Sequence, residues 1–147
     1  MKQADNLKEA ISLFNEVNNH LMNTHFSSLN NDITPKQFII LKSVYEMQPV
    51  NVQTIAKKYH LSMSSVSQLI TKLEKENYLH RELNPENRRE ILLTLGPKGQ
   101  EYFNEYERID QLIIEQYYSR LSLQETQQLR EIANKLYEVV MGETNAK

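Results

Sequence analysis

The 147-residue sequence predicts a mainly α (α+β) fold, in which a small lobe is carried between long amphipathic helices. Three observations support this prediction. Apolar residues recur at three- and four-residue spacing over most of the chain, which is the period of a buried helical face. The middle of the chain contains the spacing of two short helices joined by a tight turn. Two short strand-like runs, 79–83 and 91–95, then flank a turn-rich segment that carries two arginines.

A long amphipathic helix is predicted over residues 5–28. Its apolar residues Leu7, Ile11, Phe14 and Leu21 recur at helical spacing and form one face. Such a long helix ahead of a small lobe has no obvious core of its own to cover. We therefore expect it to pack against another helix or against a second chain.

A second helix is predicted to begin at Thr34, because a threonine cap, a proline at the first helical position and Gln37 together form a capping box. Its apolar residues point several ways at once, which indicates a helix that is buried on more than one side. Pro49 is expected to end this helix. Asn51 is then expected to cap a short helix over residues 52–58.

Residues 52–77 show the spacing of a helix-turn-helix. Counted from Ala56, the turn residue His60 lies four residues on, and Val66 and Leu69 lie ten and thirteen residues on. The motif needs a small residue where the helices cross, a left-handed turn, and inward apolar residues on the second helix. His replaces the usual Gly at the turn, but His is enriched among residues that adopt positive φ.

The second helix of this motif, predicted over 62–77, is the candidate recognition helix. Ser62 is expected to cap its start and Asn77 to end it. Its polar face carries short hydroxyl or amide side chains and one charge, and comprises Ser64, Ser65, Ser67, Gln68, Thr71 and Lys72. With Ser62, these side chains suit hydrogen bonding to base edges and phosphates. The alternative is a solvated helix face.

A β-hairpin is predicted next, with strands over 79–83 and 91–95 and a turn over 84–89. The turn carries three candidate DNA contacts, Asn87, Arg88 and Arg89. A helix followed at once by a basic hairpin is the outline of a winged helix-turn-helix, whose wing can place a guanidinium in a narrow minor groove. The alternative for the two arginines is that they only solvate the hairpin tip.

Two further helices are predicted after the hairpin. Gly96 and Pro97 favour a helix start, and the apolar and aromatic stripe that follows runs to about Arg120. Ser122 and Glu125 form a capping box for the last helix, which continues to the end of the chain. These two helices complement the long helix at the N-terminus.

The charge distribution gives mild support to a nucleic-acid partner. The whole chain carries a net charge of −2, but residues 34–95 hold nine Lys or Arg against six Asp or Glu. This segment is therefore +3 and the remainder −5. A basic middle between acidic ends is typical of a DNA-binding lobe carried on a separate scaffold.

The composition limits other classes of function. The chain has no cysteine, which excludes disulfides and thiolate metal sites, and no apolar run of about 18 residues that would predict a membrane span. The first residues do not have the pattern of a signal peptide. We expect a cytoplasmic protein without membrane contact.

No catalytic residues, cofactor or metal site are predicted. The chain has only three glycines, so it lacks a Gly-rich phosphate loop, and the serine-rich helix has no partnered base. His20 and His25 are five residues apart on one helix, which is poor phasing for a shared metal ion. An enzyme is therefore not expected.

The order of these elements resembles the MarR (multiple antibiotic resistance regulator) family of winged-helix transcription factors. The resemblance covers essentially the whole chain and is most specific in the wing. There the family's Asp-x-Arg followed by Leu-Thr corresponds to Asn87-Arg88-Arg89 and then Leu95-Gly96. The sequence departs from the family at Asn87 in place of Asp, at Gly96 in place of Thr, and at Gln68 where Arg is frequent.

The resemblance implies a homodimer joined through helices in residues 1–33 and 97–147, with a DNA-binding lobe over 34–96. It implies that helix 62–77 lies in the major groove and that an arginine of wing 84–90 enters the minor groove. Arg89 matches the family's arginine by spacing; the alternative is that Arg89 braces the hairpin and Arg88 makes the contact. The expected partner is double-stranded DNA with a pseudo-palindromic operator, and the expected output is repression. The alternative function is a winged-helix protein–protein adaptor that does not bind DNA.

The resemblance also implies release from DNA by a small, often aromatic or amphipathic effector. Five aromatic residues are candidates for lining its pocket, namely Phe14, Phe38, Tyr45, Tyr102 and Tyr106. An aromatic stripe at helical spacing is more often part of the core.

Overall fold

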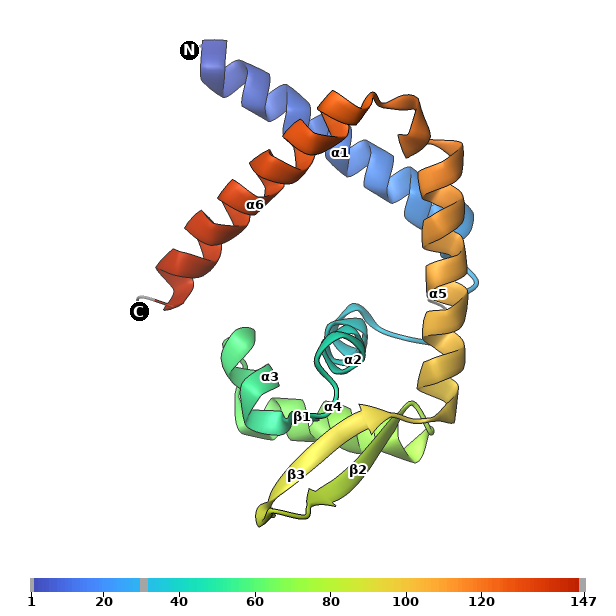
Figure 1. Ribbon diagram of the computed structural model, residues 1–147, viewed down its shortest axis with the longest axis vertical. Coiled ribbons are helices and arrows are strands. Elements are labelled where there is room, and N and C mark those ends of the chain that lie inside the picture. Colours follow the sequence, from blue (N-terminus) through green and yellow to red (C-terminus); the bar gives the residue numbers. More distant parts are fainter. Residues whose placement is uncertain (1, 30–31, 146–147) are drawn as a thin grey trace. The chain divides into compact units, whose positions relative to one another are not determined.

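The computed structural model describes residues 2–29 and 32–145 and has the predicted mainly α fold with one small sheet (Figure 1). The chain divides into two compact units, residues 1–109 and 110–147. The helices are α1 (Lys2–His25), α2 (Pro35–Met47), α3 (Val52–Lys58), α4 (Met63–Lys75), α5 (Pro97–Gln116), the 3-10 turn η1 (Tyr118–Arg120) and α6 (Leu123–Asn145). The strands are β1 (Val50–Asn51), β2 (Leu79–Asn84) and β3 (Asn87–Leu95).

Helix α2 starts and packs as the sequence predicts. The Gln37 backbone N–H donates to Thr34 Oγ1 at 3.2 Å, and the Thr34 N–H donates to Gln37 Oε1 at 2.9 Å, which completes the capping box. Ile40, Leu41 and Val44 are fully buried, so α2 lies at the centre of the lobe. Burial of three aliphatic side chains stabilises this arrangement by about 1.5–3 kcal/mol each.

The helix-turn-helix forms through local contacts. Asn51 Oδ1 caps α3 by accepting the Thr54 N–H at 2.8 Å. His60 has φ 53°, so the turn is left-handed as predicted, and the Leu61 N–H donates to the Ala56 carbonyl at 2.9 Å. Ser62 caps α4 by accepting the Ser65 N–H at 3.1 Å.

The sheet differs from the prediction in two respects. Its order is β1-β3-β2, and the two-residue strand β1, which was not predicted, pairs with β3 through Val50 opposite Leu93. A strand this short has no readable period, and its pairing depends on a partner far along the chain. The hairpin turn is also tighter than predicted, because Asn84 pairs with Asn87 and β3 begins at Asn87. Arg88 and Arg89 therefore lie on a strand and not in the turn.

The first half of helix α5 packs onto the core of the lobe formed by residues 34–96. Phe103 and Tyr102 on α5 are 1% and 5% exposed, and Phe103 packs with Leu73 and Leu93 in one buried cluster. The chain enters α5 through Gly96, where a Cβ atom would lie 2.5 Å from the Asn77 carbonyl oxygen. Glycine at this position thus allows the end of β3 to approach the end of α4 closely.

Helices α1 and α6 expose most of their apolar residues. On α1 only Leu21 is buried, and no described residue of α6 is. Helix α1 ends at His25, three residues before the predicted end at residue 28. The capping box that starts α6 is present, with the Glu125 N–H donating to Ser122 Oγ at 3.1 Å. None of the helices in the described part of the chain has an apolar stretch long enough to traverse a membrane.

Candidate nucleic-acid interface

Helix α4 has one buried face and one exposed face. Val66, Ile70 and Leu73 are buried against the lobe. At about 100° per residue, the side opposite them carries Ser64, Gln68 and Lys75, and all three are exposed. Lys75 was not among the predicted contacts, although its seven-residue spacing from Gln68 on the same helix face would have indicated it.

Ser62 and Ser65, at the start of α4, are exposed and are also hydrogen-bonded to each other. Ser62 Oγ accepts the Ser65 N–H at 3.1 Å and donates to Ser65 Oγ at 2.8 Å. Both residues are exposed, as are Thr71 and Lys72 further along the helix. The hydroxyl of Ser62 is thus already used for capping.

One of the predicted contacts, Thr71, is hydrogen-bonded to the hairpin. The Thr71 hydroxyl donates to the Ser67 carbonyl at 2.9 Å and accepts a hydrogen bond from Arg81 Nη2 at 2.8 Å. Arg81 lies on β2, and its Nε is 3.2 Å from Glu74 Oε1 on α4. The sequence did not single out Arg81, because nothing in the local pattern of β2 shows what lies opposite its side chain.

The wing presents its three predicted residues to solvent. Asn87, Arg88 and Arg89 are all exposed, and Asn87 Oδ1 accepts the Arg89 N–H at 3.2 Å. Asn87 therefore stabilises the backbone beside the turn, as a side chain of this type can do. At the other end of the turn, Asn84 Oδ1 accepts the Glu86 N–H at 3.0 Å.

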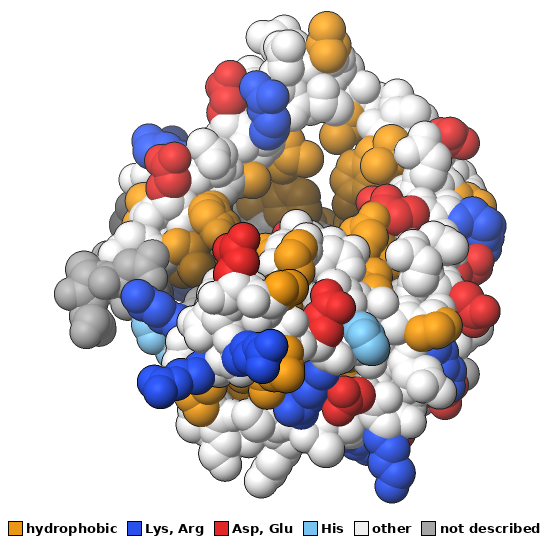
Figure 2. Space-filling view, turned by 60° about the horizontal axis from the view of Figure 1, so that its bottom comes forward, with side chains coloured by type: hydrophobic (Ala, Val, Ile, Leu, Met, Phe, Trp, Pro, Cys, Tyr) orange, Lys and Arg blue, Asp and Glu red, His pale blue; other side chains and the backbone are white. Residues whose placement is uncertain are grey.

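Arg88 and Arg89 lie where the pairing of β2 with β3 is irregular, since Leu83 pairs with Ile91 and Asn84 with Asn87. Arg89 lines a cavity of about 380 Å³ between the hairpin and the starts of α3 and α4, together with Met63, Ser67 and Arg81. Arg88 is not among the lining residues. In Figure 2, which brings the lower side of the view in Figure 1 forward, Lys and Arg side chains gather toward the lower left with Asp and Glu side chains beside them.

The five predicted pocket residues separate into different environments. Phe38 and Tyr106 line a largely apolar cavity of about 460 Å³ with Met22, Ile33, Thr34, Pro35 and Ile39, and their ring centroids are 5.6 Å apart. Tyr102 is 5% exposed and belongs to the core, where burial raises its pKa. Phe14 is 50% exposed on α1 and does not line this cavity.

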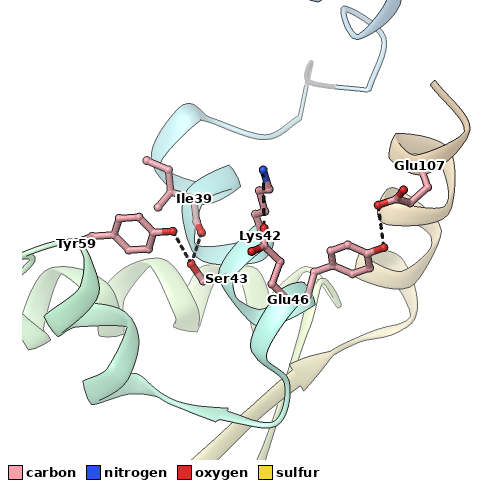
Figure 3. Close-up of polar contacts among 7 residues, drawn as sticks. Ile39, Lys42, Ser43, Glu46, Tyr59 and Glu107 are labelled. Carbon is pink, nitrogen blue, oxygen red and sulfur yellow. Dashed lines mark hydrogen bonds and ion pairs between the residues drawn. The ribbon is translucent and has the colours of Figure 1, made fainter. Parts of the chain in front are cut away.

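Tyr45, the fifth predicted pocket residue, connects α2 to α5. Its ring stacks on Phe103 with the centroids 4.2 Å apart. Its hydroxyl donates to Glu107 Oε1 at 2.9 Å, and Figure 3 shows this hydrogen bond to Glu107. This hydrogen bond to a carboxylate raises the pKa of Tyr45. On the other side of α2, the buried hydroxyl of Ser43 donates to the Ile39 carbonyl at 2.8 Å and lies 3.1 Å from the Tyr59 hydroxyl.

Comparison with known proteins identifies the family. The model of the MarR family matches residues 33–91. YkoM, an HTH-type transcriptional regulator of Bacillus subtilis, is 32% identical over 102 residues, which are 69% of this chain and 66% of that protein. MgrA, an HTH-type transcriptional regulator of Staphylococcus aureus, is 30% identical over 105 residues, which are 68% of this chain and 70% of that protein. This chain belongs to the MarR family.

Membership in the MarR family confirms the resemblance read from the wing and the helix order. The matched relatives are transcriptional regulators and not enzymes, which agrees with the expectation of a DNA-binding regulator. The match spans about two thirds of the length of these relatives. The crystal structure of Streptococcus pneumoniae FabT in complex with DNA has the same fold, with a TM-score of 0.75, 21% identity, and coverage of 95% of this chain and 97% of that one.

Proposed function

We propose that the protein is a sequence-specific repressor that binds double-stranded DNA as a homodimer in the cytoplasm. Helix 62–77 lies in the major groove and wing 84–90 in the adjacent minor groove, while residues 1–33 and 97–147 join the two copies and residues 34–96 form the DNA-binding lobe. The observation that carries this proposal is the outer face of α4. It presents Ser64, Gln68 and Lys75 to solvent, beside an exposed wing that carries two arginines.

Gln68 is the proposed base reader. Its amide can pair bidentately with N6 and N7 of adenine, because it both donates and accepts. Ser64, Ser65 and Lys72 lie near it on the exposed part of α4 and contact phosphates or neighbouring bases. An amide at this position reads adenine, in contrast to the guanine contact that an arginine makes there.

The dimer follows from the exposed apolar residues of the terminal helices. On α1 these include Leu7, Ile11, Phe14 and Val17, and on α6 they include Ile132, Leu136, Val139 and Val140, each 45–59% exposed. Apolar faces of this extent on two helices are typical of a surface that another chain covers. A two-fold dimer matches a pseudo-palindromic operator with half-sites about 10 base pairs apart.

A small aromatic or amphipathic effector is the proposed signal for release. The cavity beside Phe38 and Tyr106 has a volume of about 460 Å³ and an apolar lining that includes Met22 and Ile39. This volume is within the usual range of about 300–1,000 Å³ for small-molecule sites. The alternative function, a protein–protein adaptor without DNA binding, is disfavoured by the +3 charge of residues 34–95 in an otherwise acidic chain.

The central test measures how Gln68 contributes to specificity. The DNA upstream of the protein's own gene is footprinted, and the affinity for the protected site and for random duplex is measured by fluorescence anisotropy. Gln68→Ala should cost about 1–3 kcal/mol on the protected site and little on random DNA. Gln128→Ala on α6 is the control, because it removes the same amide outside the lobe. Equal losses on both DNAs would refute base reading by Gln68.

The wing is tested by its salt dependence. Arg89→Ala should weaken binding to all sequences and flatten the plot of log affinity against log salt by about one unit per lost contact. Asn87→Asp should preserve or improve affinity, since it restores the family's acidic residue. Light scattering should show the dimer intact. If the Arg88→Ala, Arg89→Ala double variant bound as tightly as the parent at about 0.15 M salt, the winged mechanism would be wrong.

A further inference from the structure

We propose that Arg81 is a positioning residue that ties the wing to the recognition helix, so that the two DNA-contacting elements bind as one unit. This inference rests on the proposed function, because its consequence is read out in DNA binding. It assigns to Arg81 a role that the sequence pattern of the wing did not suggest.

The contacts of Arg81 connect β2 to two successive turns of α4. Arg81 Nη2 donates to Thr71 Oγ1 at 2.8 Å, and Arg81 Nε lies 3.2 Å from Glu74 Oε1. Thr71 and Glu74 are three residues apart, so they are neighbours on one face of the helix. The guanidinium thus hydrogen-bonds Thr71 through Nη2 and forms an ion pair with Glu74, in which the buried Nε lies near the carboxylate without hydrogen-bond geometry.

The hydrogen bonding of Thr71 leaves it suited to this contact and poorly suited to DNA. Its single hydroxyl proton is donated to the Ser67 carbonyl at 2.9 Å. The lone pairs that remain accept the hydrogen bond from Arg81. The charge of Arg81 is likewise balanced by Glu74, and the two side chains are only 27% and 39% exposed. The Arg81–Glu74 pair therefore holds β2 against α4, and Arg81 is not a free cation for a phosphate contact.

The position of Arg81 on the hairpin separates an anchored part from an unsupported tip. Arg81 pairs with Leu93, which is fully buried and also pairs with Val50 of β1. Beyond this point Leu83 is 60% exposed and Arg89 is exposed. The cavity of about 380 Å³ that Arg81 and Arg89 both line lies between the hairpin and the start of α4. Arg81 thus connects the hairpin to α4 beside a gap that side chains do not fill.

The expected effect of releasing this contact is entropic. A wing that moves relative to α4 must be ordered when DNA binds, and that ordering lowers affinity without removing any contact from the complex. A direct phosphate contact by Arg81 would behave differently, because its loss would reduce the number of counterions released and flatten the salt dependence. The two roles are therefore distinguishable by experiment.

The first measurement needs no DNA. Backbone ¹⁵N relaxation is compared for the wild type, Arg81→Met and Thr71→Val, the last of which removes the hydroxyl while keeping the shape. Order parameters of residues 86–90 should fall from about 0.85 toward 0.6 in both variants while those of α4 remain unchanged. The control is Arg108→Met, which breaks an Arg–Glu pair of similar chemistry on α5, at 2.7 Å from Glu105. Unchanged order parameters of residues 86–90 in both variants would overturn the proposal that Arg81 ties the wing to α4.

The second measurement is a double-mutant cycle with the wing arginine. Arg81→Met should weaken operator binding about fivefold in the parent and less than twofold in the Arg89→Ala background, with the salt slope unchanged. An equal loss in both backgrounds, or a slope reduced by about one unit, would overturn the positioning role. If the parent bound no DNA, the proposed function would fail, while the relaxation data would still decide whether Arg81 holds the wing.

Discussion

Apolar residues at helical spacing are buried in the lobe but exposed on the terminal helices. In the lobe, Ile40, Leu41 and Leu73 are fully buried. On α6, Ile132 and Leu136 are 58% and 59% exposed although their spacing is just as regular. The lobe therefore buries its apolar residues among its own helices and strands, whereas α6 carries an apolar face with no comparable burial. The proposed dimer assigns that face to contact with a second chain.

The largest expected effect is on association. Ile132→Glu with Leu136→Glu places charges on the apolar face of α6 and should convert the dimer to a monomer. The free energy of association should fall by at least about 6 kcal/mol, because two aliphatic side chains are lost from each of two copies and each contributes about 1.5 kcal/mol. Light scattering at micromolar concentration measures the change.

The matched control for this pair is Asn134→Glu. This residue lies two positions from Ile132, which is about 200° around the helix, and it is exposed. It should leave the dimer intact. A monomeric wild type, or dissociation by both kinds of substitution, would contradict the assignment of this face.

The next largest effect is the difference in stability between removing a core phenylalanine and removing an exposed one. In the monomeric background, Phe103→Ala should cost about 3–5 kcal/mol of unfolding free energy, because it empties a core position and removes the stacking partner of Tyr45. Phe14→Ala should cost less than about 0.5 kcal/mol there, since its ring is exposed on α1. Urea denaturation gives both values. Similar costs for the two phenylalanines would show that α1 is packed in the monomer.

A smaller effect concerns the start of α6. Ser122→Ala removes the hydroxyl that accepts the Glu125 N–H, and should cost about 1 kcal/mol of stability. The Glu125 carboxylate accepts the Ser122 backbone N–H at 2.9 Å, and this hydrogen bond lowers the pKa of Glu125. The folded-state pKa lies below the unfolded one, so the contribution is present at neutral pH and is lost as the pH falls through the folded-state pKa.

Replacing Glu125 with Gln keeps an acceptor for the Ser122 N–H but removes the charge. The urea midpoint of Glu125→Gln should therefore change less than that of the wild type between neutral pH and about pH 3. The same pH dependence in both proteins would assign the acid sensitivity of α6 to other carboxylates.

Features set by neighbouring residues were predictable from the sequence. The capping boxes at Thr34 and Ser122, the cap at Ser62 and the left-handed turn at His60 all appear where the pattern placed them. Each depends on a hydrogen bond or a dihedral angle within about four residues. The buried face of α4 was predictable for the same reason, because helical period alone determines which of its residues share a side.

The roles of the site residues were less predictable, since they depend on which elements meet. The sequence indicated Thr71 as a DNA contact, whereas Arg81 from the neighbouring strand binds its hydroxyl. It grouped Tyr45 with Tyr106 as pocket residues, whereas Tyr45 stacks on Phe103 and bonds Glu107, 62 residues away. Which candidates contact DNA stays a prediction.

The sequence by itself determined the family, the order of the helices, their caps and the polar face of α4, because these follow from residue type and short-range spacing. The tertiary structure decided that β1 joins the sheet, that β3 begins at Asn87, and that Arg81 bridges β2 and α4. It also decided which aromatic side chains fill the core and which line a cavity. These outcomes require contacts between residues distant in the chain, and only the packed lobe brings those residues together.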